Sequence, residues 1–124
     1  MRAITITCGE VRLQATLLDT PTAEAVWAAL PISAKAQTWG DEVYFSVPVS
    51  AKLEADAKYV MQPGDIAFWC EGSAIAIGYG RTPASHGDEI RLVAPVNVWA
   101  KAESDVTALK AARAGVAVRV EKAG

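Results

Sequence analysis

The sequence predicts a mainly β fold: an antiparallel barrel or sandwich of eight or nine short strands with two helices. Most of the chain alternates apolar and polar residues with a period of two, in segments separated by turn residues. Two segments have the spacing of a helix with one apolar face. Strands and helices do not alternate regularly along the chain, so a parallel sheet is not expected.

The first half of the chain predicts a hairpin, a helix and a second strand pair. Residues 3–8 and 11–17 alternate, and Gly9 suits the tight turn between them because glycine tolerates positive φ. A helix is expected to start at Thr20-Pro21 and to end at Pro31. Its apolar stripe, expected to face the core, consists of Ala23, Val26, Trp27 and Leu30. Two strands should then pair across a Gly40-Asp41 turn: residues 32–39 and residues 42–47.

The second half predicts more short strands around one further helix. Residues 56–62 are either a short strand or an irregular connection, and Pro63-Gly64 marks a turn. Two runs that are apolar on both faces then predict central strands. Gly78 and Gly80 in the second run weaken a strand unless something approaches closely there. The elements after the turn are strands at 66–70 and 74–80, a loop at 81–89, strands at 90–93 and 96–101, a helix from Ser104 or Asp105 to Gly115, and a strand at 116–120.

Composition and charge exclude several classes of function. The 124 residues suit one domain, 1–124, and 52% of them are hydrophobic, which is enough to build a core. Twelve basic residues against fourteen acidic ones leave no basic excess, so neither nucleic acid nor a membrane is an expected partner. No apolar run reaches the ~18 residues of a membrane span and the N-terminus has no signal core, so a soluble, cytoplasmic protein is expected.

Cysteine and histidine are too scarce for most metal and nucleophile chemistry. The chain has Cys8, Cys70 and one histidine, His86, whereas a tetrahedral metal site uses about four such ligands. His86 is expected to be a solvated loop residue rather than a catalytic base. The two cysteines are expected to be small apolar residues, although a disulfide between them stays open. We therefore expect no metal and no cofactor, although a carboxylate-rich metal site, for which the sequence has no motif, stays open.

Four segments, in their order along the chain, carry a resemblance to a known family. They are residues 37–45 (QTWGDEVYF), 63–69 (PGDIAFW), 72–83 (GSAIAIGYGRTP) and 95–99 (PVNVW). Together with the order of strands and helices, they resemble the small prokaryotic cyclophilin-like family, whose members are stand-alone domains of poorly defined function. The resemblance implies a closed antiparallel barrel of about eight strands with two flanking helices.

The resemblance also raises the question of prolyl isomerisation. Cyclophilins isomerise X–Pro bonds in a shallow apolar cleft with a key arginine, a glutamine and several aromatic residues. The strand where that arginine would lie holds residues 36–38 (AQT), none of which is cationic. The stretch that carries the glutamine and the cleft aromatics reads Ala74-Ile75-Ala76 here. If the protein is an enzyme, a peptidyl-prolyl isomerase is the class implied, but the isomerase residues are not retained.

Aromatic and polar side chains near the turns and on the outward strand faces suit a small ligand. Aromatic rings provide area and a polar tip, and Glu42 provides one charge, so a ligand with a cation or a hydrogen-bond donor fits. The sequence also allows the tryptophans to be core residues and Glu42 to be a solvated rim residue. We expect a cleft for a peptide or a small molecule. The expected ligand-binding residues are Gln37, Trp39, Glu42, Tyr44, Trp69, Tyr79 and Arg81.

Three other functions stay open from the sequence. A weak or divergent prolyl isomerase would use Arg81 or a backbone donor in place of the missing arginine. An enzyme with Glu42 as its acid or base is supported by one isolated carboxylate. An assembly protein would pair the strand at 116–120, or the edge at 90–99, between two chains to give a homodimer.

Overall fold

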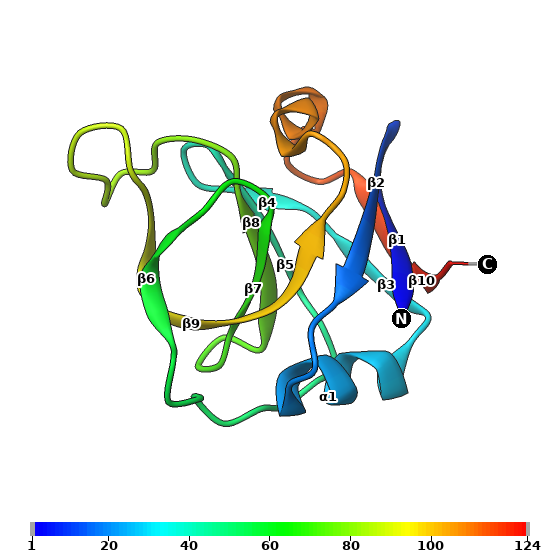
Figure 1. The fold of residues 1–124 in the computed structure, drawn as a ribbon. Helices are drawn as coiled ribbons and strands as arrows, with labels where there is room; N and C mark the ends of the chain where they lie inside the picture. Colours follow the sequence, from blue (N-terminus) through cyan, green and yellow to red (C-terminus); the bar gives the residue numbers. More distant parts are fainter. Residues whose placement is uncertain (1, 124) are drawn as a thin grey trace.

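The computed structural model describes residues 2–123, which form a nearly closed antiparallel β-barrel (Figure 1). This confirms the predicted mainly β antiparallel barrel, with ten strands in the described residues instead of about eight. The elements are β1 (Ala3–Cys8), β2 (Val11–Leu17), α1 (Pro21–Ala29), β3 (Ile32–Lys35), β4 (Gln37–Thr38), β5 (Glu42–Ser46), β6 (Lys58–Met61), β7 (Asp65–Trp69), β8 (Ala74–Gly78), β9 (Ile90–Ala102), the 3-10 helix η1 (Val106–Ala111) and β10 (Ala117–Lys122).

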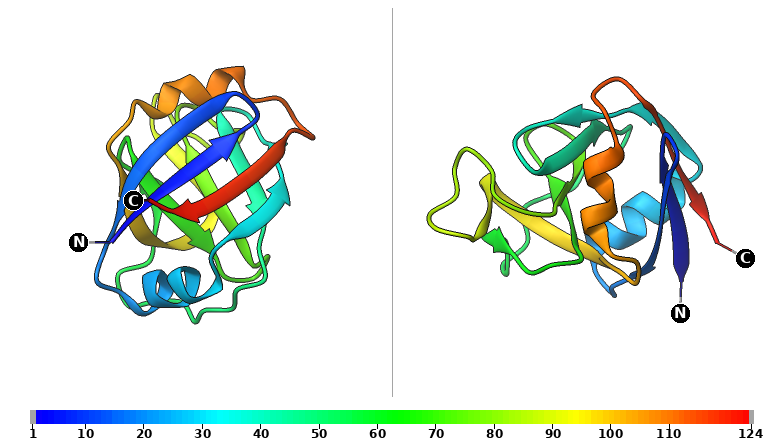
Figure 2. Two further views of the ribbon diagram at one scale, coloured as in Figure 1. Left: turned by 90° about the vertical axis from the view of Figure 1, so that its right-hand side faces the viewer. Right: turned by 90° about the horizontal axis from the view of Figure 1, so that it is seen from above.

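The strands pair in the order β3-β10-β1-β2-β9-β7-β8-β5-β4, and β6 pairs with β9 off this path. Every pairing is antiparallel. The two ends of the path, β3 and β4, follow each other in the chain, so the sheet curls back on itself. Figure 2 shows α1 across one end of the barrel and η1 across the other.

The predicted strand at 32–39 is wrong in its extent, because the chain bends at Ala36. The N–H of this buried residue donates to the Val116 carbonyl (2.9 Å), and its carbonyl accepts from the Gly115 N–H (2.7 Å). Ala36 therefore bonds to the connection before β10 and not to β5. β3 pairs with β10, and only β4 pairs with β5 across the predicted turn. The bend is what closes the barrel.

The two strands predicted at 90–93 and 96–101 are one continuous strand, β9, of 13 residues. Its first part pairs with β6 and its later part pairs with β7 and β2, so one strand serves two sheets. β10 is paired on both sides, by β1 and by β3. The strand at 116–120 therefore has no free edge of the kind that pairing between two chains would use.

The predicted helix at the start of the chain is confirmed as α1, with the Thr20 hydroxyl accepting a hydrogen bond from the Ala23 N–H (3.0 Å). Ala23 and Val26 are buried, but Trp27 is only half-buried and so is not the core residue expected. Its ring lies at the margin of the barrel, where the Arg2 guanidinium and the Lys122 ammonium sit 5.1 and 4.6 Å from the ring centre. The helix predicted from Ser104 or Asp105 to Gly115 is the short 3-10 helix η1, whose Val106 and Leu109 are buried.

Two apolar clusters explain why β7 and β8 are apolar on both faces. Ile66, Phe68, Ile75 and Ile77 belong to the main core inside the barrel. The residues between them, Ala67 and Ala76, belong to a second cluster on the opposite face of the sheet. That second cluster also contains Met61, Ile90, Leu92 and Val96 from β6 and β9, with Tyr44, Trp69 and Val98 packed against it. β7 and β8 are thus the covered central strands that the sequence predicts, and the second cluster forms the floor of the site described below.

Two contacts hold β9 over β7 and β8. A Cβ atom on Gly78 would lie 2.5 Å from Ile90 Cγ2, so the close approach expected at this glycine is made by Ile90. The carboxylate of Asp65, which is fully buried, accepts hydrogen bonds from Lys101 of β9 and from the Gln62 N–H, and pairs with Lys58 of β6. Burial alone would raise the pKa of Asp65, but these partners outweigh it and hold that pKa below its ordinary value.

Candidate functional site

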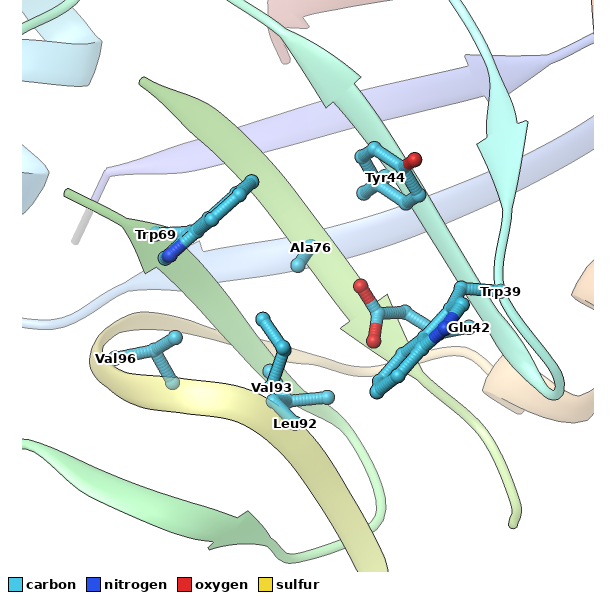
Figure 3. Close-up of a pocket in the computed structure, with 8 residues that line it drawn as sticks. All are labelled: Trp39, Glu42, Tyr44, Trp69, Ala76, Leu92, Val93 and Val96. Atoms are coloured by element: carbon cyan, nitrogen blue, oxygen red, sulfur yellow. The ribbon is translucent and has the colours of Figure 1, made fainter. Parts of the chain in front are cut away.

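A pocket of about 200 Å³ lies on the outer face of β5 and β8, beside the start of β9 (Figure 3). This is below the ~300–1,000 Å³ of a pocket for a drug-sized ligand, so it suits a smaller molecule or one end of a peptide. Most of its surface is apolar or aromatic. The lining residues are Trp39, Glu42, Tyr44, Trp69, Ala76, Leu92, Val93 and Val96.

Strand register explains how residues from β5 and β8 meet in this pocket. Tyr44 of β5 lies opposite Ala76 of β8, and Glu42 lies opposite Gly78. Because side chains alternate along a strand, Glu42, Tyr44 and Ala76 project to the same face, while Val43 fills the barrel. The small side chain of Ala76 leaves room in the pocket that a larger residue would occupy. The space beside Gly78 is filled by Ile90.

Glu42 is the one ionised or ionisable carboxyl group in the lining. The residue is only 7% exposed, and Oε1 is buried with no hydrogen-bond partner among the described residues. Burial raises the pKa of Glu42 from 4.5 to about 7. The interpretation of Glu42 as a solvated rim residue is therefore wrong, since the side chain points into an apolar pocket (Figure 3). Its proton is gained or lost near neutral pH.

The two tryptophans of the lining are held by their neighbours. The Trp39 N–H donates to the Glu42 carbonyl (3.0 Å), which closes the turn and places the indole beside the Glu42 side chain (Figure 3). Trp69 ends β7, and a Cβ atom on Gly72 would lie 2.3 Å from its ring, so this glycine leaves space for the indole. Trp69 Nε1 is buried without a partner among the described residues.

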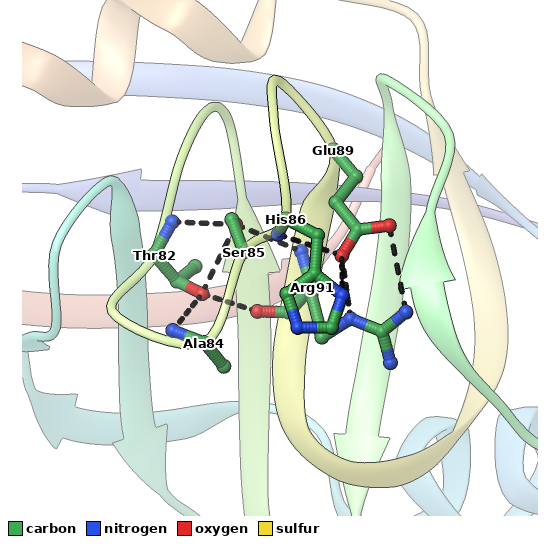
Figure 4. A network of polar contacts seen from close by, with 6 residues as sticks. All are labelled: Thr82, Ala84, Ser85, His86, Glu89 and Arg91. Atoms are coloured by element: carbon green, nitrogen blue, oxygen red, sulfur yellow. Dashed lines mark hydrogen bonds and ion pairs between the residues drawn. The ribbon is translucent and has the colours of Figure 1, made fainter.

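The loop at 81–89 supports the Trp39 turn from outside. Thr82 is buried, and its hydroxyl donates to the Arg91 carbonyl and accepts from the Ala84 N–H (3.2 Å), while its own N–H donates to Ser85 Oγ (2.9 Å) (Figure 4). A Cβ atom on Gly40, whose φ is +59°, would lie 2.9 Å from Pro83 Cδ and from Thr82 Cα. A side chain at Gly40 would therefore displace either this loop or the turn.

The structure brings together four of the seven residues expected to bind a ligand: Trp39, Glu42, Tyr44 and Trp69. Gln37 is exposed, and its Oε1 accepts a hydrogen bond from the Tyr44 hydroxyl (3.1 Å), which places it at the border. Tyr79 packs against the main core, and Arg81 is exposed; neither lines the pocket.

Sequence reasoning missed the wall that β9 contributes, which is Leu92, Val93 and Val96. Val93 is 59% exposed although it is an apolar residue within a strand. An apolar residue on the outward face of a strand is the signal that was available, but locating it needed the register of β9. Ala76 was also missed, because its small size matters only once Tyr44 is known to lie opposite it.

Other chemistry-bearing groups do not form a second site in residues 2–123. His86 is 81% exposed at its side chain and its N–H donates to Glu89 Oε1 (2.8 Å), as expected for a solvated loop residue. Cys8 and Cys70 are free thiols. No group of three or more histidine, cysteine, aspartate or glutamate side chains in this part of the chain is arranged to hold a metal ion. Within the same residues, no helix is long and apolar enough to cross a membrane.

The comparisons with known structures agree with the fold. A hypothetical protein of Archaeoglobus fulgidus, known from its solution structure, is 35% identical, with a TM-score of 0.84 over 98% of this chain and 95% of that one. McbB, solved in complex with tryptophan, is 18% identical with a TM-score of 0.66, and this chain spans 45% of it, so that likeness shows the fold alone.

The family comparison covers nearly the whole sequence. No curated protein matches the chain. The family model described as cyclophilin-like matches residues 2–121. The chain belongs to the cyclophilin-like family.

Proposed function

We propose that this protein is a binding module whose ligand, a small molecule or the end of a peptide, occupies the pocket between Trp39 and Trp69. The observation that carries the proposal is Glu42: a buried carboxyl group without a partner, aimed into an apolar pocket. Buried polar groups are nearly always hydrogen-bonded, so an unpartnered one in a concave, aromatic-lined site is accounted for by a ligand that supplies the missing donor.

The site does not support efficient prolyl isomerisation. Cyclophilins place a cationic arginine beside the prolyl nitrogen, and none of the residues that line this pocket is cationic. Arg81, the substitute that the sequence offers, lies outside the lining. We therefore expect the protein to bind ligands in the pocket without accelerating rotation about the X–Pro bond. The barrier to the uncatalysed rotation is about 18–20 kcal/mol.

Indole N–H signals in ¹H–¹⁵N NMR spectra test ligand binding directly, because the four tryptophans are in different places. Tryptophan, the compound bound by McbB in its solved complex, and a short X–Pro peptide are the first probes. We expect a bound probe to shift the signals of Trp39 and Trp69. The signals of Trp99, which is fully buried in the core, and of Trp27, which belongs to α1 at the barrel margin, are internal controls and should not move.

The same samples separate binding from catalysis. The uncatalysed X–Pro isomerisation takes about 10–100 s at 25 °C, so even modest acceleration is measurable. We expect no saturable acceleration at any protein concentration. Clear acceleration that is lost in Arg81→Ala would replace the binding module with a divergent isomerase. Probes that bind elsewhere, or not at all across a broad set of small molecules, would overturn the assignment of the pocket.

A further inference from the structure

The chemistry of the pocket wall limits which ligand charge it accepts. Of the eight lining residues, Glu42 and Tyr44 are titratable, and none is cationic. The Tyr44 hydroxyl already donates to Gln37 (3.1 Å). An anionic ligand would meet the Glu42 carboxyl with no positive side chain in the wall to offset the repulsion. The wall therefore favours a ligand that is cationic or neutral.

Charged groups on the neighbouring strands are paired elsewhere or lie off the lining. β4 and β8, which flank β5, carry no charged side chain. Desolvation is accordingly the cause of the raised pKa of Glu42, and no charged neighbour contributes to it. The charged and titratable groups of the other surrounding segments are Asp65 with Lys58 and Lys101, Glu89 with Arg91, Asp41 in the turn before β5, Glu71 in the turn between β7 and β8, and Arg81, His86 and Asp88 in the loop before β9. None of these residues lines the pocket. Within the described residues, the carboxyl group of Glu42 is thus left free for a ligand.

The aromatic side chains favour a cation over a neutral donor. Trp39 lies beside the Glu42 carboxyl, and Tyr44 and Trp69 stand on the other sides of the opening (Figure 3). The faces of indole and phenol rings carry negative potential and attract ammonium groups, most strongly where water is excluded. A carboxylate and three aromatic rings around one apolar space are complementary to an ammonium group attached to an apolar body.

We propose that the pocket selects small organic amines, in which a protonated nitrogen pairs with the Glu42 carboxylate and a flat apolar group lies among Trp39, Trp69 and the β9 wall. This inference rests on the proposed function, because it names the class of ligand for the same pocket. The inference also leads to a prediction that would not hold for a purely apolar pocket. Binding of the amine is coupled to the release of a proton from Glu42.

The sign of that coupling follows from the ionisation of Glu42. In the empty pocket the carboxyl group has a pKa of about 7, so it is mostly neutral at about pH 6 and mostly ionised at about pH 8. An ammonium ligand pairs with the ionised form. Its affinity should therefore rise about tenfold between pH 6 and pH 8, whereas a neutral ligand of the same shape gains nothing from the ionisation.

Three probes with one ring and different charges test the inference by titration calorimetry: 2-phenylethylamine, 2-phenylethanol and 3-phenylpropionate. At about pH 8 we expect the amine to bind about tenfold or more tightly than the alcohol, and the propionate to bind most weakly. Glu42→Gln keeps the shape of the side chain and removes the charge, so it should abolish both the preference for the amine and its pH dependence. Glu10→Gln makes the same change of charge in the exposed β1–β2 turn and should preserve both.

The outcomes separate this inference from the proposed function. Equal or tighter binding of the alcohol or the propionate, with shifts of the Trp39 and Trp69 indole signals, overturns the selection of amines and leaves the pocket as the ligand site. Retention of the amine preference in Glu42→Gln also overturns it. If none of the three probes moves those signals, and other small molecules also fail, both proposals fall together.

Discussion

Replacing Glu42 by glutamine should stabilise the folded protein at alkaline pH. The change in the free energy of unfolding caused by Glu42→Gln should be about 3 kcal/mol more favourable there than at about pH 4. In the unfolded chain this carboxyl group has its ordinary pKa of 4.5, whereas in the folded protein burial raises the pKa to about 7. Folded protein therefore binds the proton more tightly between these values, and stability falls as the pH rises through them. A tenfold change in a proton-binding constant, which is one pH unit in pKa, corresponds to about 1.4 kcal/mol. The difference between 4.5 and about 7 therefore gives an effect of about 3 kcal/mol.

Urea denaturation of both proteins at about pH 4, 6 and 8.5 measures this effect. Comparing the two proteins at each pH cancels the contributions of all other titrating groups, and Glu10→Gln controls for the change in net charge. A difference between wild type and Glu42→Gln that stays constant across the pH range would contradict the burial of this carboxyl group. Stability gained by removing a charged residue from a pocket is typical of positions kept for function.

Replacing Asn97 by alanine should lower the free energy of unfolding by about 3–4 kcal/mol, because it leaves several buried groups unpaired. Asn97 is fully buried in β9. Its side-chain amide donates to Thr22 Oγ1 and to the Lys52 carbonyl (both 2.9 Å), and its oxygen accepts from the Glu54 N–H (2.8 Å). One side chain thus ties β9 to the first turn of α1 and to the connection before β6.

Equilibrium urea denaturation with two comparison variants checks the role of Asn97. Asn97→Asp keeps the shape, but removes the donors and adds a charge close to the Glu54 carboxylate, so it should be at least as destabilising at neutral pH. Gln37→Ala changes an exposed amide and should alter stability by less than about 0.5 kcal/mol. A loss below about 1 kcal/mol in Asn97→Ala would mean that the three hydrogen bonds do not hold the connection.

Local sequence patterns were sufficient wherever a strand or helix is determined by its own residues. Alternation together with Gly9 predicts the β1–β2 hairpin, and Thr20 with Pro21 predicts the start of α1. Bends were not predictable in this way. The break at Ala36 depends on Gly115 and Val116, about 80 residues away in the chain, and β9 is continuous because β6, β7 and β2 each pair with part of it.

The sequence predicts which kinds of residue form the candidate site, but it does not predict the full set of residues that line the pocket. Trp39, Glu42, Tyr44 and Trp69 stand out as aromatic or charged residues near turns, and the structure brings them to one pocket. The wall from β9 and the exclusion of Arg81 depend on strand register, which periodicity places only within a few residues. The pocket around Glu42 is completed by Leu92 and Val93 of β9, which lie far from it in the sequence, so no local pattern predicts it.

The most direct test of the site is an NMR titration of the Glu42 side-chain carboxyl carbon between about pH 3 and pH 9. The signal is identified by its absence from the spectrum of Glu42→Gln. We predict a midpoint near the pKa of about 7 that burial gives this group. A midpoint near the ordinary value of 4.5 would show a solvated carboxyl group, and would contradict both the buried, unpartnered Glu42 and the ligand site built around it.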